Sequence, residues 1–340
     1  MSLGSPRGYV MTAMAFRGAL AALLSLIALF PAAAQDGATP RRVGILFSGL
    51  PSDPAAIPVR QALADGLREH GWEEGRDVLL EVRFAGPDPA SYPALAANLV
   101  ALKVDVIMTA NTQALEAARR ATTIPIVMAG ATVSEKLGFV ASFARPGGNI
   151  TGLVNQAETV SGKALQLLKE IKPGIERVGI VYSPDNIASA ATFKAQQEEM
   201  APRLGLVVVP VPVSKPADFD AAFATIVRER AQALIVYQPP VVFAHRARIA
   251  AFAIEQRLPT ACLLSVMARD GLLISYGYNN SASWRRAAWY VDRIFRGANP
   301  AEMPIEQVDR FELVVNLRTA RQLGVTIPAS ILLRADEVIE

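Results

Sequence analysis

The feature that most constrains this fold is a regular alternation of short apolar runs with longer segments of helical periodicity. In the first series the predicted strands are 43–47, 78–84, 104–108 and 126–128, and the predicted helices are 59–70, 92–102 and 112–121. Strands that alternate with helices are typical of a parallel sheet covered on both faces. The strands are nearly continuous apolar runs, which agrees with burial of both faces.

A second series of the same kind follows a stretch rich in Gly and Pro at 144–152, which we expect to be a crossover between two lobes. Its predicted strands are 178–182, 207–213, 233–237 and 260–264, and its predicted helices are 188–204, 218–230 and 241–256. The remaining predicted elements are strand 272–276, helix 283–296, strand 311–315 and helix 317–323. They are too few for a third domain, so we expect the chain to return to the first lobe and then to the second.

The predicted fold class is therefore α/β, with two similar lobes in tandem, each built on a parallel sheet. We expect one lobe to hold 35–150 plus about 265–303, and the other to hold 151–264 plus about 304–340. About 305 residues after the leader exceed what one core usually holds, which favours two domains. Several crossovers between two lobes act as a hinge, because a few residues at the ends of elements can absorb the change in φ and ψ.

The first 34 residues have the layout of a secretory signal peptide. Arg7 and Arg17 precede an apolar run at 19–30, and small residues lead to a predicted cleavage site after Ala34. The run is shorter than the roughly 20 residues that span a bilayer. We therefore expect an exported protein that works outside the cytoplasm. Cys262 lies far from the end of the leader, so the protein is not expected to be a lipoprotein.

Composition excludes several function classes. The leader contains two Arg and no acidic residue, so its removal lowers the formal charge from +3 to +1, and no basic stripe suggests nucleic-acid binding. The single cysteine, Cys262, cannot form an internal disulfide and is expected to be a small buried residue. Two distant His give no zinc site, and the phosphate-binding glycine motifs and the Gly-x-Ser-x-Gly elbow are absent. We predict no metal, no cofactor and no catalytic residue.

Several stretches resemble the exported substrate-binding proteins of ABC importers, the group that includes tryptophan- and tyrosine-type uptake proteins. The similar stretches are RVGILF at 42–47, ARPGGNITG at 144–152, GLLISYG at 271–277, RRAAWYVDRI at 285–294, FELVVNL at 311–317 and IPASILLRADEVI at 327–339. The resemblance covers essentially the whole chain after the leader. It implies a type I periplasmic binding protein in the periplasm, with two Rossmann-like lobes, three hinge crossovers and one small molecule in the cleft between the lobes.

Ligands of open α/β sheets bind beyond the carboxyl ends of the strands, which gives a set of candidate ligand-binding residues. The first lobe contributes Ser48, Gly49, Asn111, Thr112, Ala131 and Thr132, and the second contributes Tyr182, Asp185, Asn186, Tyr237, Gln238 and Ser265. This set holds hydroxyls, amides and small residues, with Asp185 and possibly Asp53 as its acids and no base. A carboxylate bound at a helix N-terminus fits, as does a ring against Tyr182 or Tyr237.

Each candidate also has a purely structural interpretation. Asn111, Thr112 and Asn186 are good helix N-caps, Asp185 is typical of a turn, and the two tyrosines suit the edge of a core.

The function that fits best is a periplasmic solute receptor of an ABC importer. It would bind an amino acid or an aromatic or aliphatic carboxylate, act as a monomer and deliver the solute to an inner-membrane permease. The alternative is a periplasmic sensing module that docks on a membrane receptor. An exported hydrolase is disfavoured because no nucleophile and base form a pair, and a DNA-binding repressor is disfavoured by the leader.

Overall fold

The structure is a computed structural model that describes residues 1, 39–53, 55–86, 88–133, 135–155 and 157–340. The predicted leader, apart from Met1, and its cleavage site lie outside these residues. Residues 40–340 form one compact unit. No helix in the described ranges is both long and apolar enough to cross a membrane.

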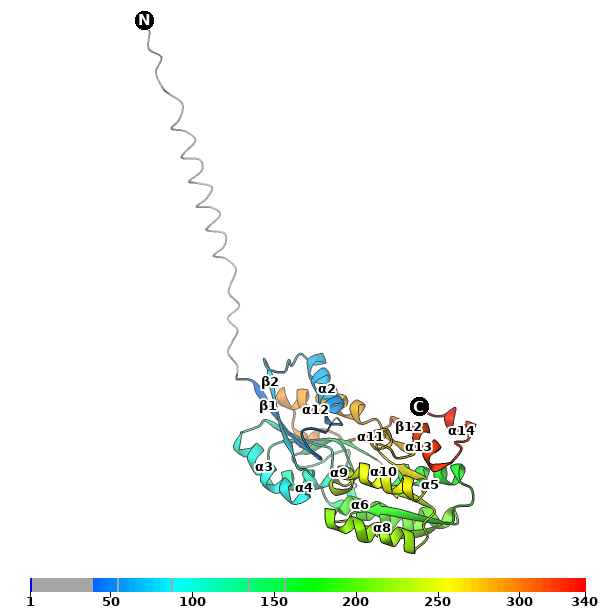
Figure 1. Ribbon diagram of the computed structural model, residues 1–340. Helices are drawn as coiled ribbons and strands as arrows, with labels where there is room; N and C mark the ends of the chain where they lie inside the picture. The colour runs from blue at the N-terminus through cyan, green and yellow to red at the C-terminus, as the bar shows by residue number, and fades with distance from the viewer. Residues whose placement is uncertain (2–38, 54, 87, 134, 156) are drawn as a thin grey trace. The chain divides into compact units, whose positions relative to one another are not determined.

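The first lobe is built on a six-stranded parallel sheet with the order β11-β5-β4-β3-β1-β2. Its strands are β1 (Arg41–Phe47), β2 (Val78–Phe84), β3 (Val106–Thr109), β4 (Ile126–Ala131), β5 (Ile150–Val154) and β11 (Glu306–Gln307). Its helices are α2 (Ala56–Glu69), α3 (Tyr92–Ala101), α4 (Thr112–Ala121) and α12 (Asn280–Phe295). Helices α3 and α4 cover one face, and α2 and α12 cover the other (Figure 1).

The second lobe is built on a seven-stranded sheet with the order β13-β12-β10-β9-β8-β6-β7. Its strands are β6 (Arg177–Tyr182), β7 (Val207–Pro212), β8 (Ala233–Val236), β9 (Thr260–Cys262), β10 (Ile274–Tyr278), β12 (Phe311–Asn316) and β13 (Glu337–Ile339). Its helices are α5 (Ala157–Ile171), α6 (Ile187–Ala195), α7 (Ala201–Arg203), α8 (Phe219–Arg228), α9 (Pro240–Ala244), α10 (Arg246–Glu255), α11 (Ser265–Arg269), α13 (Leu317–Leu323) and α14 (Ala329–Leu332). Only β10 and β12 pair antiparallel among its described strands.

The two sheets repeat one strand order, because β2-β1-β3-β4-β5 corresponds to β7-β6-β8-β9-β10. This confirms the predicted α/β class with two lobes in tandem. The chain crosses between the sheets three times: after β5, after β10 and between β11 and β12. The predicted three crossovers are therefore present.

The crossings lie later in the chain than the lobe boundaries predicted at 150, about 265 and about 303. The segment at 144–152, expected to be the first crossover, instead leads into β5, which pairs with β4 in the first sheet. β10 belongs to the second sheet, because it pairs with β9 and β12. Whether the two lobes are independent domains with the predicted boundaries stays a prediction.

Some helix boundaries differ from the predictions for local reasons. The helix predicted at 188–204 contains a wide turn at Gln196–Met200, and the helix predicted at 241–256 breaks at His245 into α9 and α10. α12 begins three residues earlier than predicted, because the side chain of Asn279 accepts a hydrogen bond from the Ala282 N–H. The new helix starts at Arg246 and Asn280 bear directly on the site described below.

Cys262 is fully buried in β9. Burial raises the pKa of its thiol to about 12, so the thiol stays protonated at neutral pH. This confirms the predicted role of Cys262 as a small core residue.

Helix α12 packs tightly on α2, although more than 200 residues separate them in sequence (Figure 1). Gly66 makes this possible. A Cβ at position 66 would lie 2.6 Å from the carbonyl oxygen of Arg285 and 2.8 Å from Cβ of Ala288. The missing side chain lets the two backbones approach.

We expect Gly66→Ala to lower the free energy of unfolding by about 1–3 kcal/mol, because overpacking outweighs the gain of up to about 1 kcal/mol in helix propensity. Thermal denaturation measures the change. Gly174→Ala is the matched control, because a Cβ at position 174 would meet nothing within 4 Å. A Gly66→Ala protein as stable as the wild type would show that the helices do not depend on this close approach.

Candidate functional site

A cavity of about 460 Å³ is lined by residues of both lobes. Most of its lining follows the carboxyl ends of parallel strands, as predicted for this class of fold. The segments after β1, β3 and β4 line it from the first lobe, and those after β6, β8 and β9 line it from the second. The size lies within the range of about 300–1,000 Å³ that small-molecule sites occupy.

Eight of the twelve candidate residues line the cavity: Ser48, Asn111, Thr112, Thr132, Asn186, Tyr237, Gln238 and Ser265. Their roles in ligand binding stay predictions.

The other four candidates are not part of this lining. Gly49 forms a backbone bridge with Gly86, and Ala131 is fully buried in the first sheet. The ring of Tyr182 stacks on Phe193 with centroids 3.9 Å apart. Asp185 is exposed in the turn before α6.

Hydrogen bonds between side chains hold the first-lobe wall of the cavity in place. Asn111 caps α4 by accepting from the Ala114 N–H at 2.8 Å, and its Nδ2 donates to Ser48 Oγ at 3.2 Å and to Tyr92 OH at 3.0 Å. Burial raises the pKa of Tyr92 to about 12, so its hydroxyl stays neutral. This wall is therefore a preorganised polar surface, in which Asn111 both caps α4 and lines the cavity.

A second network lies where the chain first leaves the first lobe. Asn155 Nδ2 donates to the carbonyl oxygen of Gly130 at 2.8 Å, and Thr132 Oγ1 donates to Asn155 Oδ1 at 2.9 Å. Burial raises the pKa of Tyr278 to about 12, against a hydrogen bond to Asn155 that lowers it. Asn155 thus connects β4, the first crossover and the end of β10 around the cavity.

Arg246 forms an ion pair between the lobes at the cavity. Its Nη2 donates to Asp53 Oδ1 of the first lobe at 2.8 Å, and its Nε donates to Asp270 Oδ2 of the second lobe at 2.6 Å. The side chains of Arg246 and Asp53 are only 12% and 10% exposed, so solvent screens this pair weakly. The Phe243 ring lies 4.5 Å beneath the guanidinium. The contact stabilises the arrangement in which both lobes enclose the cavity.

Sequence reasoning missed this arginine and expected no base at the site. The continuous helix predicted at 241–256 hid the helix start at Arg246, which places its guanidinium beside the cavity. A second arginine, Arg269, also lines the cavity and pairs with Glu337. Arg246 could have been predicted as a lining residue only from the helix break at His245. No sequence pattern marks that break.

The start of α12 is the other feature that sequence reasoning missed. Asn279, Asn280, Ser281 and Trp284 all line the cavity. Asn279 Nδ2 donates to Glu312 Oε2 at 2.9 Å. The rule that ligands bind after parallel strands would have found these residues, had the strand been placed at Ile274–Tyr278 rather than at 272–276.

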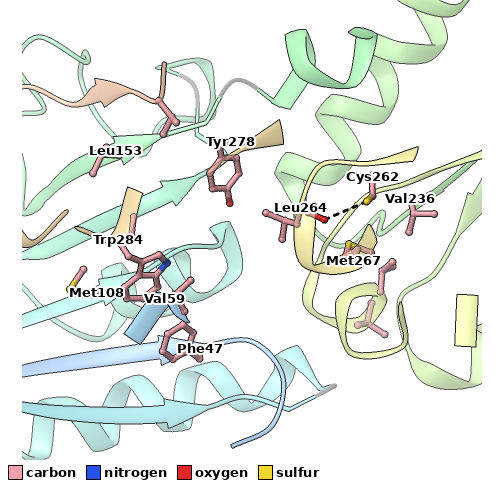
Figure 2. Packing of buried hydrophobic residues seen from close by; sticks show 14 of the residues in the cluster. Phe47, Val59, Met108, Leu153, Val236, Cys262, Leu264, Met267, Tyr278 and Trp284 are labelled. Carbon is pink, nitrogen blue, oxygen red and sulfur yellow. Dashed lines mark hydrogen bonds between the residues drawn. The ribbon is translucent and has the colours of Figure 1, made fainter. Parts of the chain in front are cut away.

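The cavity also has an aromatic wall. Phe47, Tyr237, Phe243, Tyr278 and Trp284 line it, and Phe47 stacks on Trp284 with centroids 4.8 Å apart. Figure 2 shows Phe47 and Trp284 on the first-lobe side, Leu264 on the second-lobe side and the ring of Tyr278 between the two sides. No group of His, Cys, Asp and Glu in the described part of the chain is arranged to hold a metal ion.

Two lobes of one strand order, three crossovers and a cavity lined by both lobes are typical of two-lobed solute-binding proteins. Residues 48–339 match the family described as ABC transporter substrate binding protein, and the chain belongs to that family. Proteins of this family are the solute-binding components of ABC systems and act outside the cytoplasmic membrane.

Individual relatives agree with this assignment. The chain is 22% identical over 289 residues to a tyrosine-binding protein of Clostridioides difficile (strain R20291), a match that covers 85% of this chain and 82% of that one.

Two solved structures share the fold over 88% of this chain. A conserved domain protein from Vibrio cholerae O1 biovar El Tor has a TM-score of 0.79 and 28% identity, with 99% of that chain covered. An ABC domain in complex with L-Trp from Streptococcus pneumonia has a TM-score of 0.78 and 23% identity, with 100% of that chain covered.

We expect Asp53→Asn to shift the protein toward an open form. Hydrogen bonds to charged groups contribute about 1.5–3 kcal/mol, and Arg246 keeps Asp270, so the ratio of closed to open molecules should fall about tenfold. Small-angle X-ray scattering of the ligand-free protein would record a larger radius of gyration.

Asp220→Asn is the control for this change. Asp220 pairs with Arg248 within the second lobe, and its side chain is 87% exposed. Identical scattering of the wild type and Asp53→Asn would contradict a closing role for the Asp53–Arg246 pair.

Proposed function

We propose that this protein binds a free amino acid with an apolar or aromatic side chain in the cavity and delivers it to the permease of an ABC importer. One observation carries the choice of ligand. Gln238 Oε1, Asn280 Oδ1 and Trp284 Nε1 line the cavity and are buried without a hydrogen-bond partner among the described residues. Two acceptors and one donor call for a solute that carries both donors and an acceptor.

This inventory favours an amino acid over a simple carboxylate. A carboxylate only accepts hydrogen bonds, so with these amide orientations it would leave Gln238 Oε1 and Asn280 Oδ1 unpaired, at a cost of about 1–3 kcal/mol for each buried group. The ionisable lining supports the same choice, since it holds Asp53, Asp270 and Glu312 but only Arg246 and Arg269. An ammonium group compensates the excess of acids. Of the two ligand classes predicted from the sequence, the amino acids therefore fit the cavity better than the aromatic or aliphatic carboxylates.

The aromatic wall supports an apolar or aromatic ligand side chain, because rings pack on rings in offset or edge-to-face geometry. Two relatives agree with this choice, since one is a tyrosine-binding protein and the other is bound to L-Trp.

The cellular setting of the proposal follows from the leader and the family. We propose that the protein is exported by a signal peptide cleaved after Ala34, works in the periplasm without a lipid anchor, and binds its solute as a monomer. The lobes would close on the ligand, and the closed form would dock on the inner-membrane permease. We propose no enzymatic activity.

Calorimetric titration of the purified protein, after unfolding and refolding to release any carried ligand, tests the function. We expect L-tyrosine, L-tryptophan, L-phenylalanine or L-leucine to bind and to raise the melting temperature. For an aromatic amino acid that binds, we expect the deaminated analogue, such as 3-(4-hydroxyphenyl)propanoate for L-tyrosine, to bind at least tenfold more weakly.

Two outcomes would count against the proposal. Equal binding of the amino acid and its deaminated analogue would return the choice to carboxylates. Absence of binding by every amino acid in the panel would refute the proposed ligand class.

A further inference from the structure

Trp284 is a fully buried tryptophan whose indole N–H has no partner among the described residues. Its side chain is 0% exposed, and Nε1 has no hydrogen-bond acceptor in the part of the chain that the structure describes. An indole nitrogen only donates, and leaving it buried and unpaired costs about 1–3 kcal/mol. Trp72 shows the usual solution, since its Nε1 donates to Asp292 Oδ1 at 2.9 Å. The unpaired donor at Trp284 needs an explanation.

The position of Trp284 supplies one, because it lines the cavity. Its ring is held by the stack on Phe47, with centroids 4.8 Å apart and planes 21° apart, so the N–H cannot turn easily to another partner. Figure 2 shows the indole nitrogen on the side of the ring that faces the second lobe, while the hydroxyl of Tyr278 points toward the same region.

Asn280 lies one helical turn before Trp284 and also lines the cavity, and its buried Oδ1 has no hydrogen-bond partner in the described ranges. Residues four apart are neighbours on a helix face, with Cβ atoms about 5–6 Å apart. The first turns of α12 thus offer one donor and one acceptor side by side. The carboxylate and ammonium of an α-amino acid are matched to such a pair, because one carbon carries both.

We propose that Trp284 Nε1 donates a hydrogen bond to the carboxylate of the bound amino acid, while Asn280 Oδ1 accepts from its ammonium. This inference rests on the proposed function and assigns its specificity to α12. In this arrangement α12 binds the carboxylate and the ammonium that all amino acids share, and the ligand side chain extends along the aromatic wall. The helix N-terminus, with its partial positive charge, adds to the attraction for the carboxylate.

The experiment uses the amino acid that binds most tightly in the calorimetric panel as its probe. We expect Trp284→Phe to weaken its binding about 10–100-fold, and Trp289→Phe to leave it unchanged. Trp289 lies on the same helix but is not part of the cavity lining, and its ring contacts Tyr290 and Arg286.

Loss of packing could lower affinity in Trp284→Phe, so a second replacement isolates the hydrogen bond. Benzothienylalanine introduced at position 284 keeps the shape of the ring and replaces the N–H with sulfur. We expect at least a tenfold loss of affinity with an unchanged melting temperature of the ligand-free protein. In the ¹H–¹⁵N spectrum, the indole signal missing from Trp284→Phe should move downfield when the wild type binds the probe.

The outcomes separate the two proposals. If the wild type binds the probe and the benzothienylalanine protein binds it equally well, or the Trp284 indole signal does not move, the assignment of Trp284 is wrong while the proposed function stands. If the wild type binds no amino acid of the panel, both proposals fail.

Discussion

The return of the chain to the first lobe, locked by the contact of α12 with α2 at Gly66, is the constraint on which the rest of the structure depends. It completes the hydrophobic cover of one face of the first sheet. It also carries Asn279, Asn280 and Trp284 to the cavity. A helix encoded after most of the second lobe therefore helps to build the first, and the ligand site cannot form from either half of the sequence alone.

The Asp53–Arg246 pair complements this covalent linkage with an electrostatic one. The crossovers keep the lobes connected in any state, whereas the ion pair exists only when the lobes approach. A nearly buried pair of this kind is sensitive to the loss of either partner, because the remaining charge is left without compensation. In the proposed function, ligand and ion pair favour the same closed state, so the energy of the pair contributes to affinity without contact with the ligand.

The sequence predicted the fold in its main lines because the signal is strong and local. Buried parallel strands must be continuously apolar, and the helices between them are punctuated by caps and glycines, so the two series could be read directly. The points where the chain crosses between the lobes were harder to predict. β5 and β10 are apolar strands, and their sequences do not show which of the two sheets they join. Long-range pairing decides their membership, and no local pattern encodes it.

The same contrast between local and long-range signals explains which residues of the candidate site could be predicted. Ser48, Asn111 and Thr132 could be predicted to line the cavity because they follow strands, which is a local rule. Arg246 and Trp284 were missed because their roles depend on a helix break and on the docking of α12. Tyr182 was also predicted from its place at a strand end, but it is not part of the cavity lining, and its ring stacks on Phe193.

The central claim is that both lobes hold one amino acid in this cavity. A crystal structure of the protein grown with the tightest-binding amino acid of the panel tests it most directly. We expect density for the amino acid in the cavity, within hydrogen-bond distance of Gln238 from the second lobe and of α12 from the first. An empty cavity, or a ligand bound by one lobe alone, would contradict it.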